Sequence, residues 1–347
     1  MRIALVVPGP FETVVSGGYI YDRRMVQRLR DAGHEVRVVE LAGRHPLPDA
    51  AAEAAARAAL DAVPEETRLV IDGLGLPAFA PLALDLRARR AVALIHHPTA
   101  LETGFAPEAR ETLKARERLL FNACARLIAT SNLTAARLAE EFGCDASRIG
   151  VVEPGTAPAE RARGSGGSGC AILAAGTLVP RKGHDVLLRA LARLTDLDWR
   201  LTIAGGARDP VYAHGLEAMV EELGLAGRVT FAGEVDGAGL DALYDRSDIF
   251  ALATRWEGYG MVAAEAMARG LPLAITAGGA IADVVPTGAA IVAAVDDHVS
   301  LSKGMRRLIF DAGLRAAMAE TAWEAGQRLP RWRDRAELFA AELEKAG

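Results

Sequence analysis

The sequence lacks the features that mark several classes of protein. Its three cysteines, Cys124, Cys144 and Cys170, show no C-x-x-C spacing, so we expect neither disulfide bonds nor a cysteine zinc site. No run of residues reaches the ~18 apolar positions that a membrane-spanning helix needs. The formal net charge of −5 argues against a nucleic-acid partner. Together these absences predict a protein of the reducing cytoplasm.

Two other signatures are missing near the N-terminus. The apolar run Met1–Val7 is too short for the hydrophobic part of a signal peptide and precedes Pro8 and Pro10, so we expect a buried strand. The loop after it contains Gly17-Gly18 but no G-x-G-x-x-G, which removes the key feature of a dinucleotide-dependent dehydrogenase. Backbone N–H groups at this glycine pair are placed to meet a phosphate at a helix start, although the pair is equally consistent with a plain tight turn.

The composition is that of a globular protein, with 51% hydrophobic and 24% charged residues over 347 positions. A chain of this length is too long for one ordinary core, so we expect two domains. Short apolar runs alternate with helical patterns, which is typical of parallel β-α-β units. The expected strands are 3–7, 36–40, 69–71, 91–95, 127–129 and 149–152, followed by 171–175, 201–204, 229–232, 249–253, 273–276 and 290–292. The predicted fold class is therefore α/β, with two Rossmann-like, doubly wound domains.

A glycine- and serine-rich segment, Arg163–Gly169, interrupts this alternation. Its composition is that of a flexible linker. We therefore expect a first domain over residues 1–162, a linker over 163–169 and a second domain over 170–330. Two doubly wound domains that face each other across a cleft would place a ligand at the carboxyl ends of their strands.

The stretch Leu252–Gly279 holds the chemistry around which the chain is organised. Strong helix formers predict a helix from Met261 to Ala268 that ends at Gly270. Glu257 precedes its first turn, and Glu265 lies roughly 7 Å along its axis. The two carboxylates bracket a helix N-terminus that favours an anion, and carboxylates bind hydroxyls, so a nucleotide sugar fits the pattern. The alternative is that Glu257 only caps the helix and Glu265 is a solvated surface residue.

A second chemical feature is the pair Arg181-Lys182, which follows the first expected strand of the second domain and precedes a helix. Two adjacent cations beside Gly183 at a helix start are well placed to meet a pyrophosphate. The alternative is a solvated basic turn.

These motifs resemble those of the retaining GT-B glycosyltransferases of family GT4. The most specific of them is a Glu followed by seven residues and a second Glu, here Glu257-Gly-Tyr-Gly-Met-Val-Ala-Ala-Glu265, and the resemblance covers essentially the whole chain. It implies that Glu257 contacts hydroxyls of the transferred sugar and that Glu265 contacts the ribose of the nucleotide. It also implies that the sugar and the phosphates lie against the backbone of Gly258, Tyr259, Gly260, Met261 and Val262.

The resemblance extends to other loops expected to bind the donor. The family's Lys before Gly matches Lys182. Many members carry Arg directly after the first Gly of this loop, where the present chain has Thr177, so we expect Arg181 to substitute for that charge. The remaining residues expected to bind the donor are Gly17 and Gly18 in the first domain and Gly176, Thr177, Gly205 and Val235 in the second.

The resemblance also concerns the histidine pair at the end of the fourth expected strand, His96-His97-Pro98. Family members often carry a histidine here, close to the transferred sugar and the acceptor. Pro98 favours an extended residue before it, which would expose His97 at the strand end. His97 is therefore the predicted catalytic histidine, and His96 is the alternative or a hydrogen-bonded core residue. No third ligand with useful spacing follows the pair, so we expect no metal.

In the family, a C-terminal helix crosses back to the first domain. The amphipathic tail at residues 334–345 fits such a helix. We therefore expect residues 331–347 to pack on the first domain, with Trp332 at the crossing.

The activity implied by the resemblance is transfer of a hexose-type sugar from a nucleoside-diphosphate sugar, UDP favoured over GDP, with retention at the anomeric carbon. Glu257, Arg181, Lys182 and His97 are the expected catalytic residues, with no cofactor and no metal. The segment Glu108–Arg118 mixes acidic and basic residues like an ordinary solvated helix, so a small hydroxyl acceptor is favoured over a lipid or polysaccharide, and membrane-surface contact is not expected.

Three other functions remain open on the sequence. A sugar-nucleotide-binding or partner protein of the same fold with weak catalysis is one, because Thr177 departs from the family pattern. A phosphorylase of the same fold is another, although Glu265 as a ribose ligand argues against it. A dehydrogenase is the weakest. The sugar, the acceptor and the oligomeric state are left open.

Overall fold

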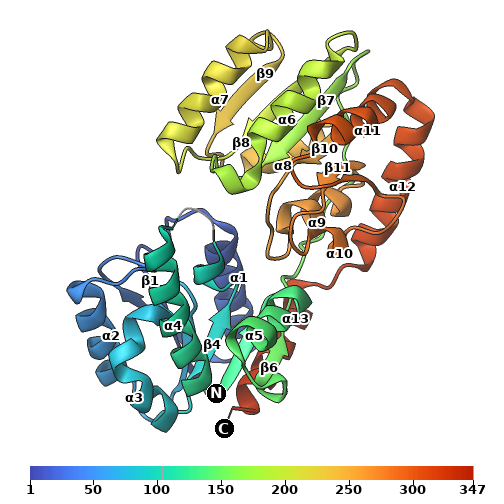
Figure 1. Ribbon diagram of the computed structural model, residues 1–347. Helices are drawn as coiled ribbons and strands as arrows, with labels where there is room; N and C mark the ends of the chain where they lie inside the picture. The colour runs from blue at the N-terminus through green and yellow to red at the C-terminus, as the bar shows by residue number, and fades with distance from the viewer. Residues whose placement is uncertain (103–104, 347) are drawn as a thin grey trace. The chain divides into compact units, whose positions relative to one another are not determined.

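The computed structural model describes residues 1–102 and 105–346, which Figure 1 shows as a ribbon. Contacts divide the chain into two compact units. Unit 1 comprises Met1–Gly155 together with the segment from Pro330 onward, and unit 2 comprises Thr156–Leu329. Each unit holds a six-stranded sheet whose paired strands run parallel, with helices packed against it. The predicted α/β class with two doubly wound domains is confirmed.

The sheet of unit 1 has the strand order β2-β1-β3-β4-β5-β6. Its strands are β1 (Arg2–Pro8), β2 (Glu35–Leu41), β3 (Arg68–Asp72), β4 (Val92–Ile95), β5 (Arg126–Ala129) and β6 (Ile149–Val151). Its helices are α1 (Gly17–Asp31), α2 (Ala50–Ala62), α3 (Ala83–Ala88), α4 (Pro107–Ala123), α5 (Asn132–Phe142) and α13 (Trp332–Glu344), with short 3-10 turns η1 (Leu76–Leu82), η2 (Thr99–Leu101) and η3 (Ala146–Arg148).

The sheet of unit 2 has the order β12-β11-β10-β7-β8-β9. Its strands are β7 (Cys170–Ala175), β8 (Trp199–Ala204), β9 (Val229–Gly233), β10 (Ile249–Leu252), β11 (Leu273–Thr276) and β12 (Ala290–Ala293). Its helical elements are η4 (Pro180–Lys182), α6 (His184–Leu191), η5 (Ala192–Leu194), α7 (Pro210–Glu222), α8 (Gly237–Asp245), α9 (Met261–Ala268), α10 (Ile281–Val284), α11 (His298–Phe310) and α12 (Ala312–Arg328).

The central strands are apolar along their whole length because helices cover both faces of each sheet. Every residue of β4 and of β10 is buried, and so is every residue of β1 after Arg2. Continuous apolar runs of this kind are what parallel sheets require. Each strand expected from the sequence is present, with ends within about two residues of the prediction.

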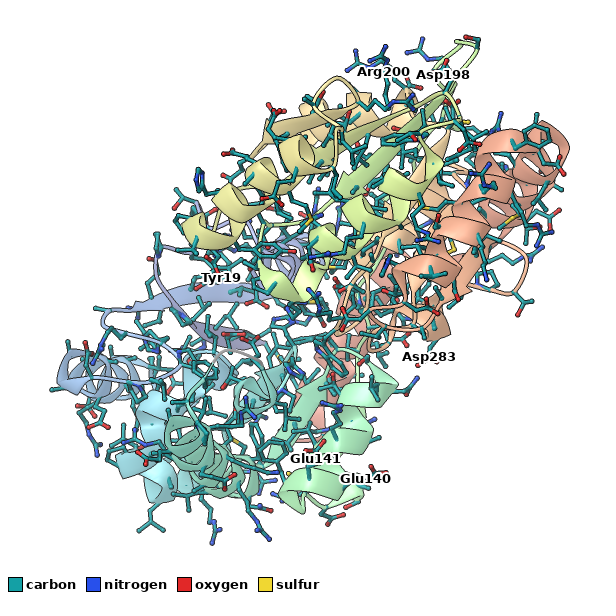
Figure 2. The ribbon with its side chains drawn as sticks, turned by 45° about the horizontal axis from the view of Figure 1, so that its top comes forward. Tyr19, Glu140, Glu141, Asp198, Arg200 and Asp283 are labelled. Atoms are coloured by element: carbon teal, nitrogen blue, oxygen red, sulfur yellow. The ribbon has the colours of Figure 1, made fainter. Side chains whose placement is uncertain are left out.

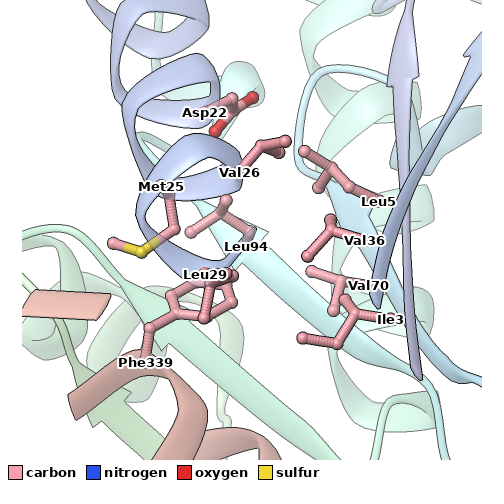
Figure 3. Close-up of a pocket in the computed structure, with 10 residues that line it drawn as sticks. All are labelled: Ile3, Leu5, Asp22, Met25, Val26, Leu29, Val36, Val70, Leu94 and Phe339. Carbon is pink, nitrogen blue, oxygen red and sulfur yellow. The ribbon is translucent and has the colours of Figure 1, made fainter. Parts of the chain in front are cut away.

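The C-terminal helix α13 belongs to unit 1, where it packs beside α1 on the sheet. Trp332, its first residue, is buried with its ring 5.5 Å from that of Tyr21, edge to face. Gly155 allows this packing, because a Cβ there would lie 2.4 Å from the Trp332 backbone. Further along α13, Phe339 closes a small cavity under α1, as Figure 3 shows. The side chains around that cavity are those of Ile3, Leu5, Asp22, Met25, Val26, Leu29, Val36, Val70, Leu94 and Phe339.

The boundary between the units differs from the predicted one. The division falls after Gly155 rather than at residues 163–169, and the glycine-rich segment lies within unit 2. There the backbone N–H groups of Arg163 and Gly164 donate to the carbonyl of Asp245, and that of Ser165 donates to the Asp248 carboxylate. Composition alone indicated a linker because it does not show these partners.

None of the helices in the described part of the chain combines the length and the apolar character needed to cross a bilayer. The three cysteines are free thiols and are buried. Burial raises the pKa of Cys124 to about 12 and that of Cys144 to about 11, which keeps both as thiols at neutral pH.

Candidate functional site

The strand orders place a topological switch point in each sheet, where successive connections leave in opposite directions. In unit 2 it lies between β7 and β10, and in unit 1 between β1 and β3. Ligands of doubly wound sheets bind at such points, outside the carboxyl ends of the strands. Asp198 and Arg200 flank the first residue of β8 and so mark the opposite, amino end of the unit 2 sheet (Figure 2).

The loop after β10 is held rigidly by backbone contacts. The N–H of Glu257 donates to the carbonyl of Gly278 at 3.0 Å, and the N–H of Ala280 donates to the carbonyl of Glu257 at 2.9 Å. Gly279 has φ +76°, and a Cβ there would lie 2.2 Å from the Glu257 carbonyl. Only glycine permits this approach. The loop then enters α9 through Gly260, which has φ +99°.

The loop after β7 approaches the same point. It contains η4, whose last residue is Lys182, and then Gly183 with φ +63°. A Cβ on Gly183 would lie 1.9 Å from the carbonyl oxygen of Ala253, so glycine is what lets this loop reach the end of β10. The N–H of Arg255 completes the connection by donating to the carbonyl of Arg181 at 2.8 Å.

These two loops bring Lys182, Arg181 and Glu257 together. Nζ of Lys182 donates to Oε1 of Glu257 at 2.5 Å, and Nη1 of Arg181 lies 4.0 Å from the same oxygen. The side chains of Lys182 and Glu257 are only 12% and 9% exposed. Burial opposes the charge of Glu257, but Lys182, Arg181 and a 3.2 Å hydrogen bond from Thr254 hold its pKa below the ordinary value. Glu257 is therefore a carboxylate at neutral pH.

Two loops approach each other closely beside Lys182, one at Gly176-Thr177 and the other at Gly205. A Cβ on Gly205 would lie 2.0 Å from the carbonyl of Gly176 and 3.0 Å from the N atom of Thr177. A Cβ on Gly176 would lie 3.2 Å from the Lys182 chain, so the lysine stem runs over this glycine. Nε2 of His184 donates to the Gly176 carbonyl at 3.3 Å, and burial lowers the pKa of this histidine to about 4, so it adds no charge.

Glu265 is oriented from α8 by Tyr244, which the sequence did not indicate. The Tyr244 hydroxyl donates to Oε2 of Glu265 at 3.2 Å and also lies 3.1 Å from the carbonyl of Val262. Arg269 stacks over the Tyr244 ring at 4.5 Å and donates to the Glu265 carbonyl at 3.0 Å. Burial raises the pKa of Tyr244 well above its ordinary value, so the phenol remains a donor.

Arg255 fixes the position of the loop that carries Glu257. Its guanidinium binds Asp185 through two hydrogen bonds of 2.8 and 3.0 Å and Asp296 through one of 2.7 Å. The Tyr212 hydroxyl donates to Asp185 at 2.6 Å. Although burial opposes the charge, the hydrogen bonds from Arg255 and Tyr212 lower the pKa of Asp185. The sequence offered one signal for this pair: Arg255 and Asp185 have opposite charges and lie in or beside the two segments that were expected to bind the donor.

A second cluster lies at the switch point of unit 1. Nε2 of His96 lies 3.0 Å from Oδ1 of Asp22, on α1, and 3.5 Å from Oδ2 of Asp72, the last residue of β3. A Cβ on Gly18 would lie 3.2 Å from the His96 ring, whereas one on Gly17 would meet nothing within 4 Å. Of the two adjacent histidines, His96 is thus the one that packs against the predicted glycine pair.

Burial and charge set the protonation of this cluster. Burial, with the nearby Asp22 carboxylate, raises the pKa of Asp72 to about 7. Burial would lower the pKa of His96, but Asp22 and Asp72 outweigh it and raise that pKa. The three side chains offer donor atoms within 4.8 Å of one another, as metal ligands would. The sequence was expected to show no third ligand after the histidine pair, and the two carboxylates of this cluster precede it. The absence of a metal stays a prediction. The spacing of 3.0 Å is that of a hydrogen bond.

The structure distributes the predicted site residues between the two units. Gly17, Gly18 and His97 belong to unit 1, where His97 is half-buried beside His96. In unit 2, Tyr259 is buried and Val235 packs against the core on one side of the sheet. The other predicted residues of unit 2 lie in the loops after β7, β8 and β10 or in α9; they are Gly176, Thr177, Arg181, Lys182, Gly205, Glu257, Gly258, Gly260, Met261, Val262 and Glu265.

Two family models match adjacent parts of the chain. Glycosyltransferase Family 4 matches residues 15–160, and Glycosyl transferases group 1 matches residues 163–324. D-inositol 3-phosphate glycosyltransferase of Mycobacterium sp. (strain KMS) is 34% identical over 233 residues, which are 61% of this chain and 52% of that protein. Mannosylfructose-phosphate synthase of Agrobacterium fabrum (strain C58 / ATCC 33970) is 30% identical over 191 residues, 50% of this chain and 42% of that protein. The chain spans about half the length of the curated relatives it matches.

Solved structures share the fold over nearly the whole chain. Sucrose-phosphate synthase (tll1590) from Thermosynechococcus elongatus superposes with a TM-score of 0.82 at 20% identity, covering 98% of this chain and 100% of that one. Anabaena Alr3699/HepE in complex with UDP-glucose gives 0.80 at 17% identity, covering 99% and 100%. At these identities the likeness shows the fold, which is the GT-B arrangement expected from the sequence.

Proposed function

Since the chain belongs to the family 4, or group 1, glycosyltransferases, we propose that it is an enzyme that transfers a hexose-type sugar from a nucleoside-diphosphate sugar to a hydroxyl acceptor, with retention at the anomeric carbon. One observation supports this above all others. Arg181 and Lys182 meet Glu257 at the switch point of unit 2, directly before the N-terminus of α9. A diphosphate needs the cations and the helix end, and sugar hydroxyls need the carboxylate.

In the proposed reaction, the bond between the anomeric carbon and the diphosphate breaks while the acceptor oxygen attacks on the same face. The acceptor proton passes to an oxygen of the departing diphosphate. Lys182, Arg181 and the N-terminus of α9 stabilise the negative charge that develops on that group. Glu257 orients the sugar through its hydroxyls, and Glu265 holds the ribose. The two cations take the place that a divalent metal has in other transferases, so we propose a metal-independent reaction.

The donor and acceptor classes complete the proposal. UDP is favoured over GDP, and the Anabaena protein of the same fold was solved with UDP-glucose. A small hydroxyl acceptor is favoured over a lipid or polysaccharide, and relatives named for D-inositol 3-phosphate fit that choice. His97 is proposed to lie near the reacting sugar. The proposed location is the cytoplasm.

The proposal is tested first by thermal shift with UDP, GDP, ADP and their common sugars, with and without EDTA. A ligand that binds only the folded state stabilises it by about 2.7 kcal/mol at a hundredfold excess over Kd. We expect one nucleotide to raise the Tm regardless of EDTA. The anomeric proton of the transfer product, followed by NMR, then reports retention. Binding without turnover on any hydroxyl acceptor would favour a sugar-nucleotide-binding protein, and no binding would overturn the proposed function.

A further inference from the structure

We infer that Glu257 acts as a gate that makes unit 2 select an intact sugar nucleotide over a bare nucleoside diphosphate, because Glu257 forms an ion pair with Lys182, the cation that a diphosphate needs. The inference rests on the proposed function and deepens it. Glu257 competes with the diphosphate for Lys182 before and after transfer, in addition to any contact with the sugar.

Lys182 and Glu257 already satisfy each other within unit 2. Lys182 donates to Glu257 at 2.5 Å, and both side chains are largely buried. The lysine stem is confined over Gly176, so its ammonium has little freedom to serve a phosphate and the carboxylate together. The cation expected to bind phosphate is therefore already neutralised by an anion of the same unit.

A bare diphosphate would disrupt this ion pair. Its oxygens would draw the ammonium of Lys182 away from Glu257. The carboxylate would then keep Thr254 at 3.2 Å and Arg181 at 4.0 Å, and Nη1 of Arg181 already donates to the carbonyl of Trp256 at 2.8 Å. A buried carboxylate that loses its cation is strongly destabilised, so part of the binding free energy of the diphosphate is lost.

A sugar attached to the diphosphate would give Glu257 new hydrogen-bond donors. Sugar hydroxyls at Glu257 would donate to the carboxylate as the lysine leaves it, so the intact donor satisfies both members of the pair. Once the sugar has moved to the acceptor, the carboxylate again competes for Lys182 and expels the diphosphate product. The same ion pair thus disfavours the product and favours the substrate.

Removal of the Glu257 charge should strengthen the binding of a bare diphosphate, although Glu257 is itself a site residue. Glu257→Gln keeps the shape of the side chain but releases Lys182, so it should bind UDP about tenfold more tightly or better, while UDP-glucose gains nothing or loses affinity. A residue that only contacts the sugar would leave UDP binding unchanged. GDP and GDP-mannose replace this pair of ligands if GDP gives the larger thermal shift. Isothermal titration calorimetry measures both affinities directly.

A double-mutant cycle separates the gate from simple removal of a negative charge. In a Lys182→Met background, Glu257→Gln should no longer tighten UDP binding, because no lysine remains to be released. A through-space effect would persist in that background and overturn the gate. Glu222→Gln, an exposed carboxylate on α7, is the matched control and should leave UDP affinity unchanged. Glu257→Ala is the second variant if the glutamine protein fails to fold, and it too should tighten UDP.

The outcomes distinguish the gate from the proposed function. Wild-type protein that binds neither nucleotides nor sugar nucleotides would overturn the proposed function and the gate with it. Wild-type protein that binds both, with no gain of UDP affinity in either Glu257 variant, would overturn the gate alone. A gain of UDP affinity that vanishes in the Lys182→Met background supports it.

Discussion

At the switch point of unit 1, two buried carboxylates, Asp22 and Asp72, share one imidazole, whereas at the switch point of unit 2 one buried carboxylate, Glu257, is held by Lys182 with Arg181 beside it. Each cluster belongs to a unit built on a parallel six-stranded sheet. In the first the pKa of Asp72 rises to about 7, and in the second the pKa of Glu257 falls.

The difference shows that the switch points of two similar sheets can hold clusters of opposite electrostatic character. Burial opposes the charge of a carboxylate in both units. In unit 2 the adjacent cations reverse that effect, which leaves a site for anions. In unit 1 a second carboxylate adds to it, which leaves a cluster that takes up protons near neutral pH. Substitutions that change one member of one cluster, or the backbone that supports it, test this contrast.

The largest effect is expected at Lys182. Lys182→Met should lower kcat with the sugar-nucleotide donor by ~10²–10³-fold, because it removes a cation from the departing diphosphate. It should also destabilise the fold by about 3 kcal/mol, since Glu257 stays buried without its lysine. Steady-state kinetics and urea unfolding measure the two effects. The double variant Lys182→Met/Glu257→Gln separates them: it should recover much of the stability and none of the turnover. Full activity in Lys182→Met would remove this residue from the mechanism.

The second effect comes from the close backbone approach that shapes unit 2. Gly279→Ala places a methyl group 2.2 Å from the Glu257 carbonyl at a φ of +76°. We expect a loss of ~2–3 kcal/mol of unfolding free energy and weaker nucleotide binding. Gly17→Ala is the control in unit 1, where a Cβ meets nothing within 4 Å and α1 begins. That variant should be neutral or stabilise by a few tenths of a kcal/mol. Equal effects of the two substitutions would contradict the contrast in backbone packing between the two glycines.

The third prediction concerns pH. Asp72 holds its proton more tightly in the folded chain, with a pKa of about 7 against an ordinary 3.8. Its stabilising contribution is therefore complete below about pH 4 and is lost as the pH rises to about 7. The raised pKa of His96 acts in the same direction as the pH rises beyond 6.5. Glu257 behaves oppositely: its pKa is lowered from 4.5, so its contribution is lost only on acidification below that value.

Hydrogen exchange resolved by peptide checks this contrast at about pH 5 and about pH 8. Peptides of β3 and β4 should be less protected against global opening at the higher pH, by ~2 kcal/mol, after correction for intrinsic exchange rates. Asp72→Asn should flatten much of that dependence, and Glu140→Gln, whose side chain projects from α5 in Figure 2, should leave it intact. Greater protection of the unit 1 strands at pH 8 would show that the cluster is ionised differently.

The smallest effect is expected at Tyr244. Tyr244→Phe removes the hydroxyl that donates to Glu265 at 3.2 Å and leaves the ring under Arg269. The loss of one hydrogen bond of ~1 kcal/mol should weaken UDP binding a few-fold and reduce the preference for UDP over its 2′-deoxy analogue. Tyr212→Phe is the control, because its hydroxyl serves Asp185 instead. An unchanged ribose preference in Tyr244→Phe would show that this tyrosine does not position Glu265 for the nucleotide.

Much of the fold followed from local patterns. The apolar runs of central strands such as β4 and β10 are continuous because both faces of each sheet are covered, and this makes them recognisable in the sequence. Helix α9 occupies the predicted residues Met261–Ala268, since its glycine entry and its helix formers are adjacent in sequence. The division of the chain was placed too late, because the contacts that hold Arg163–Gly169 to unit 2 involve residues about 80 positions away.

The amino-acid sequence by itself determined the two doubly wound sheets, the helix after Glu257 and the presence of charged residues in the loops that follow the strands. The tertiary structure alone decided which of those charges meet. Lys182 and Glu257 are 75 residues apart, and Asp22 and His96 are 74 apart. Their pairing depends on glycines that let separate loops approach within contact distance, and on burial that turns such contacts into shifted pKa values. Composition and spacing along the chain show neither the close approach of the loops nor the burial of the charges. Both arise only where distant segments exclude water from the same point.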